Sequence, residues 1–112
     1  MNIAQIAKMA QQMQTQMAKT QEELQDTVLE ATAGGGAVRV VITGSQEIRS
    51  IEIDPSAVDP DEVEMLQDLV VAAVNDAIGR SKELERERMG KIAGGMGLPG
   101  MPGGPMLPPP RR

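Results

Sequence analysis

Residues 33–54, AGGGAVRVVITGSQEIRSIEID, decide the fold of this chain. After three glycines, Val38, Val40 and Ile42 alternate with other residues, a period-2 pattern typical of a strand with one buried face. Residues 47–53 alternate again, and Gly44-Ser45 before them is a two-residue turn signal in which glycine adopts a positive φ. With the β-branched stretch at residues 27–33, the pattern predicts a three-stranded antiparallel meander.

The core available to this sheet is thin. The chain has 112 residues, 40% of them hydrophobic, with nine Met and no Phe, Tyr or Trp. Leu, Ile, Val, Ala and Met bury less area each than aromatic rings, and thin cores are often completed by a second subunit. The alternation also places Val41 and Ile48 on the second face of the sheet, so that face is not wholly polar and is available to another copy.

Long helices are predicted on both sides of the meander. Residues 3–26 carry apolar side chains at three-and-four spacing, from Ile3 to Leu24, without Gly or Pro. After residue 58, Asp59 serves as the N-cap, Pro60 as the first helical residue and Glu62 as the third, which is a strong helix start. A wide apolar stripe on the following residues contacts the sheet and, as we expect, a partner.

The second helix is predicted to leave the core after Ile78 and to continue through the charged stretch GRSKELERERMGK. Residues 94–112, GGMGLPGMPGGPMLPPPRR, hold six Gly and six Pro and predict a flexible tail. The expected organisation is therefore a dimerising α-β-β-β-α domain at residues 1–93, of the α+β class, followed by a tail at residues 94–112.

Composition excludes most catalytic chemistry. The chain has no His, Cys or Tyr, which removes the usual general base, thiol nucleophile and phenolic acid, and any disulfide or Cys/His metal site. The glycine triplet precedes a strand rather than a helix and lacks the P-loop Lys, and the acidic run at residues 54–64 lacks the spacing of an EF-hand. We expect a cytosolic protein that is not an enzyme and has no cofactor, metal, small-molecule substrate or membrane segment.

The net charge of -5 is unevenly distributed. Residues 1–21 hold two Lys and no acid, residues 54–76 hold seven acids and no base, and residues 80–91 hold five bases and three acids. The free ends of the two helices are expected to project from the same side of the sheet. Basic side chains there suit contact with DNA phosphates without sequence preference. The candidate DNA-binding residues are Lys8, Lys19, Arg80, Lys82, Arg86, Arg88 and Lys91.

Two alternatives remain open from the residues alone. Mixed-charge helix ends are usually only solvated, although the like charges at four-residue spacing, as in Lys82 and Arg86, favour a basic stripe. The Met-rich first helix or the Pro-rich tail can instead recruit another protein, which would make the chain a protein-interaction adaptor.

The ordered features resemble the YbaB/EbfC family of bacterial nucleoid-associated proteins. The resemblance rests on AGGGAVRVVITG, on Ile53-Asp54-Pro55 and on the segment EMLQDLVVAAVNDAIGRSKE within the second helix. It implies an α-β-β-β-α homodimer that binds double-stranded DNA with little sequence preference, alters its conformation and associates with the nucleoid, with effects on gene expression and nucleoid organisation. The paired helices are expected to grip the duplex as arms.

Overall fold

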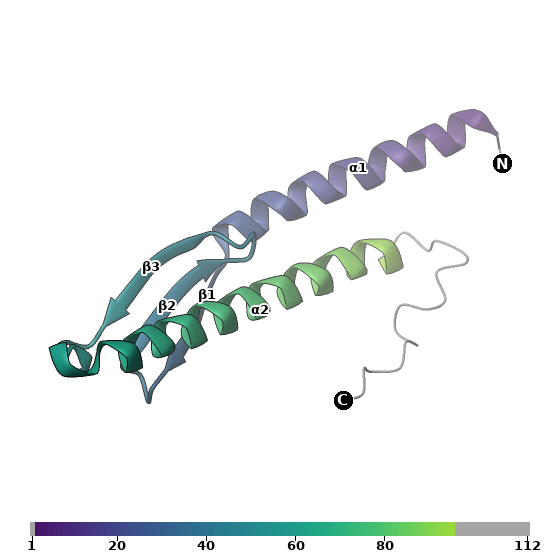
Figure 1. Ribbon diagram of the computed structural model, residues 1–112. Helices are drawn as coiled ribbons and strands as arrows, with labels where there is room; N and C mark the ends of the chain where they lie inside the picture. Colours follow the sequence, from purple (N-terminus) through teal and green to yellow (C-terminus); the bar gives the residue numbers. More distant parts are fainter. Residues whose placement is uncertain (1, 96–112) are drawn as a thin grey trace, which may run out of the picture.

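The structure, a computed structural model that describes residues 2–95, contains one sheet and two long helices (Figure 1). Helix α1 (Ile3–Asp26) precedes strands β1 (Val28–Ala33), β2 (Val38–Thr43) and β3 (Ile48–Ile53), and helix α2 (Val63–Gly95) follows them. Two short 3-10 turns, η1 (Pro55–Ala57) and η2 (Pro60–Glu62), link β3 to α2. The predicted α+β order of elements is confirmed.

The predicted tail at residues 94–112 lies outside the described residues, apart from Gly94 and Gly95, which belong to α2. The described chain is elongated and measures 69 × 32 × 16 Å. Its length comes from the helices, because α1 and α2 both extend beyond the sheet (Figure 1).

A capping box starts α1. The side chain of Asn2 accepts a hydrogen bond from the backbone N–H of Gln5 at 2.8 Å, and the Gln5 side chain accepts one from the backbone N–H of Asn2 at 3.3 Å. These bonds satisfy two donors that a helix start otherwise leaves unpaired. The sequence analysis missed this signal, although the spacing of Asn2 and Gln5 carries it.

The three strands form an antiparallel meander with β2 in the centre. Residues 34–37 connect β1 to β2, and the three glycines among them have positive φ, between 66° and 96°. A left-handed conformation at three successive positions is accessible to glycine at little cost. This run of glycines therefore fixes the first hairpin, as predicted.

A register shift between Val41 and Ile42 changes the face of one residue. Val41 pairs with Ser50, whereas Ile42 pairs with Ile48, so Arg49 is the extra residue on β3. Ile48 consequently lies on the same face as Ile42, and the prediction that it lies on the second face was wrong. A bulge of this kind interrupts the strict alternation on which the prediction depended.

The turn between β2 and β3 has three residues and not two. The backbone N–H of Thr43 donates to the carbonyl of Glu47 at 2.8 Å, and the positive φ of 66° belongs to Gln46 rather than to Gly44. Gly44 is required for another reason. A Cβ at this position would lie 2.8 Å from Leu24 Cδ2 and 3.0 Å from the Leu24 carbonyl oxygen.

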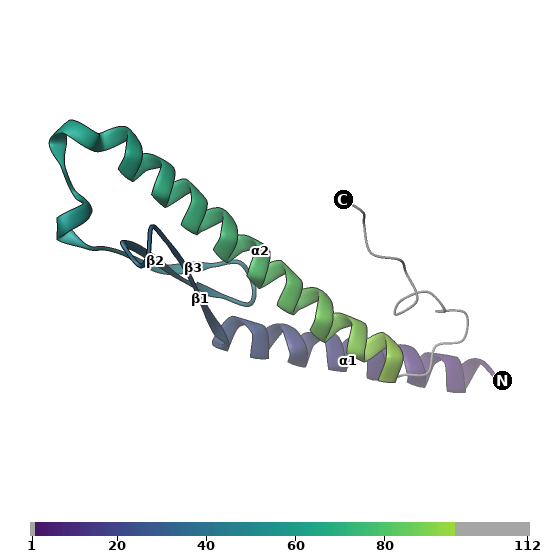
Figure 2. The same ribbon diagram turned by 90° about the horizontal axis from the view of Figure 1, so that it is seen from below.

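Helix α2 covers one face of the sheet over β1 and β2 (Figure 2). Ala73 and Ala77 are fully buried, and their small side chains let the helix approach the strands closely. They pack in one cluster with buried apolar residues of the strands, namely Ala31, Val38, Val40 and Ile42. The core is as thin as predicted, and it leaves β3 uncovered, because every residue of that strand is exposed.

The opposite face of the sheet is held by an ion-pair ladder. The guanidinium of Arg39 forms an ion pair with Glu30 on β1 and a second one, at 2.9 Å, with Glu52 on β3. The hydrogen bond to Glu52 and the negative charge of Glu30 raise the pKa of Arg39 above its usual value. All three side chains are exposed, so the ladder contributes to strand pairing by about 1 kcal/mol or less per pair.

Helix α2 begins one turn later than predicted. Asp59 does act as a cap, but its side chain accepts a hydrogen bond from the backbone N–H of Asp61 at 2.9 Å, and residues 60–62 form the 3-10 turn η2. The α-helix proper starts at Val63. Tight 3-10 turns are frequent at helix starts, and the capping signal does not distinguish them from the first α-turn.

The close approach at Gly44 predicts that alanine substitutions at Gly44 and Gly79 change the free energy of unfolding in opposite directions. We expect Gly44→Ala to lower the free energy of unfolding by about 1–3 kcal/mol, because the added Cβ meets backbone as well as side-chain atoms of Leu24. In Gly79→Ala the new Cβ meets no atom within 4 Å, so replacement of a helical glycine should stabilise the protein by about 0.5–1 kcal/mol. Urea denaturation of both variants measures the difference; equal effects would contradict it.

Candidate DNA interface

The two helices project from the same end of the sheet as a pair of arms. We define the N-terminal arm as residues 3–19 of α1 and the C-terminal arm as residues 80–95 of α2. Figures 1 and 2 show both arms extending in one direction, with the N-terminus and the end of α2 on the same side of the molecule. The predicted common direction of the helix ends is thus confirmed for the single chain.

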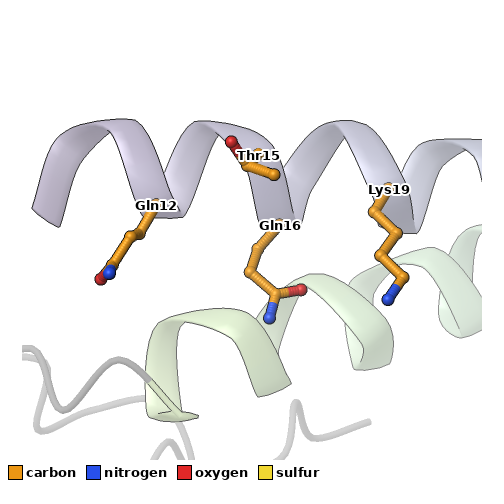
Figure 3. Close-up of a pocket in the computed structure, with 4 residues that line it drawn as sticks. All are labelled: Gln12, Thr15, Gln16 and Lys19. Atoms are coloured by element: carbon orange, nitrogen blue, oxygen red, sulfur yellow. The ribbon is translucent and has the colours of Figure 1, made fainter. Parts of the chain in front are cut away.

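The N-terminal arm carries two of the candidate residues on one helix face. Lys8 and Lys19 are exposed and separated by 11 residues, about 16 Å along the axis. Gln12 and Gln16 lie between them and extend from the same side of α1 as Lys19 (Figure 3). A shallow groove of about 390 Å³ is lined by Gln12, Thr15, Gln16 and Lys19.

The two glutamines are functional candidates that the sequence analysis missed, because it treated them only as helix formers. Side-chain amides donate hydrogen bonds to phosphate and sugar oxygens, which is a common contribution to DNA binding. Their four-residue spacing, which places both on one helix face together with the lysines, was the available signal.

The C-terminal arm carries the other five candidates. Arg80, Lys82, Arg86 and Lys91 are exposed, and Arg88 is half-buried. Glu85 is also half-buried and accepts a hydrogen bond from Gln21 at 3.3 Å, which links the C-terminal arm to the part of α1 near the sheet. This contact turns one of the three acids of the arm toward α1 and not outward.

Two of the arginines take part in ion pairs within α2. Arg80 Nε lies 3.0 Å from Asp76, and Arg86 contacts Glu83 three residues earlier. Lys82 and Arg86 have the same sign at four-residue spacing, as the sequence analysis noted, but Arg86 pairs with Glu83 on a different row, three residues earlier. Exposed pairs of this kind are worth about 0.5 kcal/mol, so a phosphate can displace the carboxylate.

Charge separates along the length of the molecule. The arms hold seven bases and three acids, whereas residues 20–79 hold two bases and thirteen acids. Glu64 and Arg86 are 22 residues apart on one straight helix, about 33 Å, and the Debye length is about 8 Å at physiological ionic strength. The carboxylates about η2 therefore weaken the attraction of the arms for a polyanion only slightly, whereas Glu22 and Glu23 lie within four residues of Lys19.

The acidic residues near η1 and η2 have structural roles of their own. Asp54 accepts hydrogen bonds from the backbone N–H and the hydroxyl of Ser56, and the backbone bond above all lowers the pKa of its carboxyl.

Within residues 2–95, no group of three or more potential ligands is placed to hold a metal ion. In the same part of the chain, neither helix has an apolar segment long enough to cross a membrane.

Comparison with known proteins finds one solved structure of similar fold and several proteins of similar sequence. A crystal structure of an uncharacterized protein from Helicobacter pylori superimposes with a TM-score of 0.71 at 25% identity, covering 78% of this chain and 91% of that one. A nucleoid-associated protein of Chloroflexus aurantiacus is 54% identical over 96 residues, which are 86% of this chain and 96% of the relative. Another, from Acetivibrio thermocellus, is 52% identical over 102 residues, or 91% and 88% of the two chains.

The family-level match covers the whole described chain. The profile of the YbaB/EbfC DNA-binding family matches residues 1–96, from the N-terminal arm through the sheet to the end of the C-terminal arm. This is a family of DNA-binding proteins and not of enzymes, in agreement with the missing catalytic residue types. On this match and on the identity to its curated relatives, the chain belongs to the YbaB/EbfC DNA-binding family.

Proposed function

We propose that this protein is a homodimeric nucleoid-associated protein of the cytoplasm that grips double-stranded DNA between its arms, with little sequence preference. In this proposal the DNA-binding residues are Lys8, Lys19, Arg80, Lys82, Arg86, Arg88 and Lys91. The observation that carries it is the gathering of seven bases on two helices that point the same way. Several arms contacting one duplex also give a means of altering DNA conformation and nucleoid organisation, and through them gene expression.

The charges favour phosphate contacts over base recognition. Lysine and arginine on exposed helices bind phosphates irrespective of the DNA sequence. Most non-specific affinity comes from the counterions that the DNA releases when its phosphates are neutralised. The chain has no aromatic residue on which unpaired bases could stack, which favours a duplex over a single strand.

Charge reversal on the C-terminal arm tests this function. We expect Arg86→Glu/Arg88→Glu to weaken duplex binding at least tenfold, and to reduce the slope of log affinity against log salt by about 0.9 for each phosphate that the variant no longer neutralises. Gel shifts at two or more salt concentrations measure both quantities. The single variant Arg86→Glu is compared with the control Arg49→Glu, because each changes the net charge by the same amount. Arg49 lies on β3, so light scattering must first show that the control is still a dimer. Equal affinities of these two variants would remove the arm from the interface.

The ion pairs of α2 predict a variant that binds more tightly. Glu83→Gln removes the carboxylate that holds Arg86, and we expect duplex affinity to rise about two- to fivefold, an effect below 1 kcal/mol. Glu62→Gln changes the net charge equally at the acidic end of the molecule and should leave affinity unchanged. If both variants bind alike, net charge rather than the position of Glu83 controls binding.

The uncovered strand supports the homodimer. Ile48, Ile51 and Ile53 are 38–43% exposed on the face of the sheet that α2 covers elsewhere. On α2, Val63 and Val71 are about half exposed as well. An edge strand with exposed apolar side chains on one face invites coverage by another chain, and a second copy of this small protein completes its core.

A substitution on β3 tests whether the dimer can be lost while the single chain stays folded. We expect Ile51→Glu to reduce the mass in solution, measured by light scattering, from twice 11.9 kDa to 11.9 kDa. Ser50→Glu introduces the same charge at the neighbouring position on the opposite face and should leave the dimer intact. A dimeric Ile51→Glu variant would place the interface elsewhere.

The adaptor function remains a second candidate because apolar side chains stay exposed on the N-terminal arm. Ile3 is 83% exposed, Ile6 52% and Met17 45%. A partner recruited through this row would be retained at high salt and after nuclease treatment, whereas binding through DNA would be abolished under both conditions. Pull-downs under these two conditions distinguish the candidates.

A further inference from the structure

The turn between β2 and β3, residues 43–47, lies against both helices at the end of the sheet from which the arms project. It is one place where segments from the two halves of the chain meet, the direct contact of α1 with α2 through Gln21 and Glu85 being another. Its own shape is fixed by the bond from the Thr43 N–H to the Glu47 carbonyl and by the left-handed Gln46. A rigid turn in this position can hold both helices at the points where they leave the sheet.

The contact with α1 is made by backbone atoms. The N–H of Gly44 lies 2.9 Å from the carbonyl oxygens of both Leu24 and Thr27, at the last turn of α1. Leu24 is fully buried, and Gly44 leaves no room for a Cβ beside it. The end of α1 is thereby held directly on the turn.

The contact with α2 is made by one buried hydroxyl. Ser81 is fully buried, and its Oγ donates a hydrogen bond to the Thr43 carbonyl at 2.6 Å. The same oxygen accepts bonds from the backbone N–H of Gln46 at 3.1 Å and from its side-chain amide at 2.9 Å. A serine hydroxyl has one donor and two acceptor positions, and here all three are used.

Ser81 stands at the point where α2 leaves the sheet. It continues the row of small buried residues formed by Ala73 and Ala77, and the exposed arm begins beside it. From Ser81 to Lys91 the helix rises about 15 Å, so a tilt of about 15° at Ser81 displaces Lys91 by about 4 Å. A small change at this hydroxyl is therefore magnified along the arm.

We propose that the β2–β3 turn sets the spacing and angle between the two arms of each subunit, with Ser81 as the positioning residue. The inference rests on the proposed function insofar as arm spacing governs DNA binding, since phosphates occupy fixed positions along a duplex. Ser81 does not touch DNA in this proposal. It acts by fixing where the lysines and arginines of the C-terminal arm stand relative to Lys8 and Lys19.

The absence of cysteine allows a direct measurement. Spin labels at Gln12→Cys and Glu87→Cys, both exposed, report the distance between the arms by pulsed electron paramagnetic resonance. Doubly labelled subunits are diluted with unlabelled protein so that only distances within one subunit are seen. The distribution is compared in the otherwise native chain, in Ser81→Ala and in the control Ser50→Ala, whose serine is exposed on β3.

Glu87 lies six residues beyond Ser81, about 9 Å along the helix axis, so the same tilt of about 15° displaces it by about 2 Å. We expect Ser81→Ala to shift or broaden the distance distribution by about 2 Å, while Ser50→Ala leaves it unchanged. The dissociation constant for a duplex should rise about two- to tenfold in Ser81→Ala, although every basic residue is retained. A residue with a role in stability alone would lower the melting temperature without moving the arms of the folded protein.

A second variant keeps the test decisive if Ser81→Ala fails to fold. Gln46→Gly removes the side-chain bond to Ser81 and keeps the left-handed backbone, which glycine adopts readily, so the fold should be retained. We expect a smaller shift in the same direction. Unchanged distances in the folded variants would overturn the inference, whereas a native protein that binds no DNA would overturn the proposed function and leave the distance result valid.

Discussion

The close packing of α2 on the central strand is the interaction on which the rest of the structure depends. Ala73 and Ala77 meet Val38, Val40 and Ile42 in a cluster without aromatic residues. Because these side chains are small, the helix lies near the sheet and the buried area is modest. The same helix then continues beyond the sheet as a straight arm, so one element supplies both the core and the proposed interface.

Sequence periodicity predicted most of this fold because each element carries a strong local signal. The glycine triplet, the alternation in β2 and the cap at Asp59 all depend on residues close together in the chain. The errors arose where distant residues decide the outcome. Gly44 is needed by the packing of Leu24 and not by its own φ, and the bulge that turns Ile48 to the covered face has no signature in the alternation.

The candidate site was predicted in part by the same means. Charge counting found the basic residues, and the expected topology gave the arms a common direction, because both follow from composition and connectivity. The ion pair of Arg86 with Glu83 and the partial burial of Arg88 depend on side-chain conformations and neighbours, which spacing alone does not determine. The role of Ser81 was also beyond reach, since its partners lie 35 and 38 residues away.

The separation of charge along the molecule has a consequence for how it meets DNA. A duplex attracts the basic helix ends and repels the carboxylates about η2, so an approaching molecule experiences a torque before any contact forms. On the proposed function, this field turns productive faces toward the duplex during diffusion and makes encounters in the reverse orientation short-lived. An acidic protein can in this way associate rapidly with a polyanion, and added salt slows its capture by weakening both the pull and the turning force.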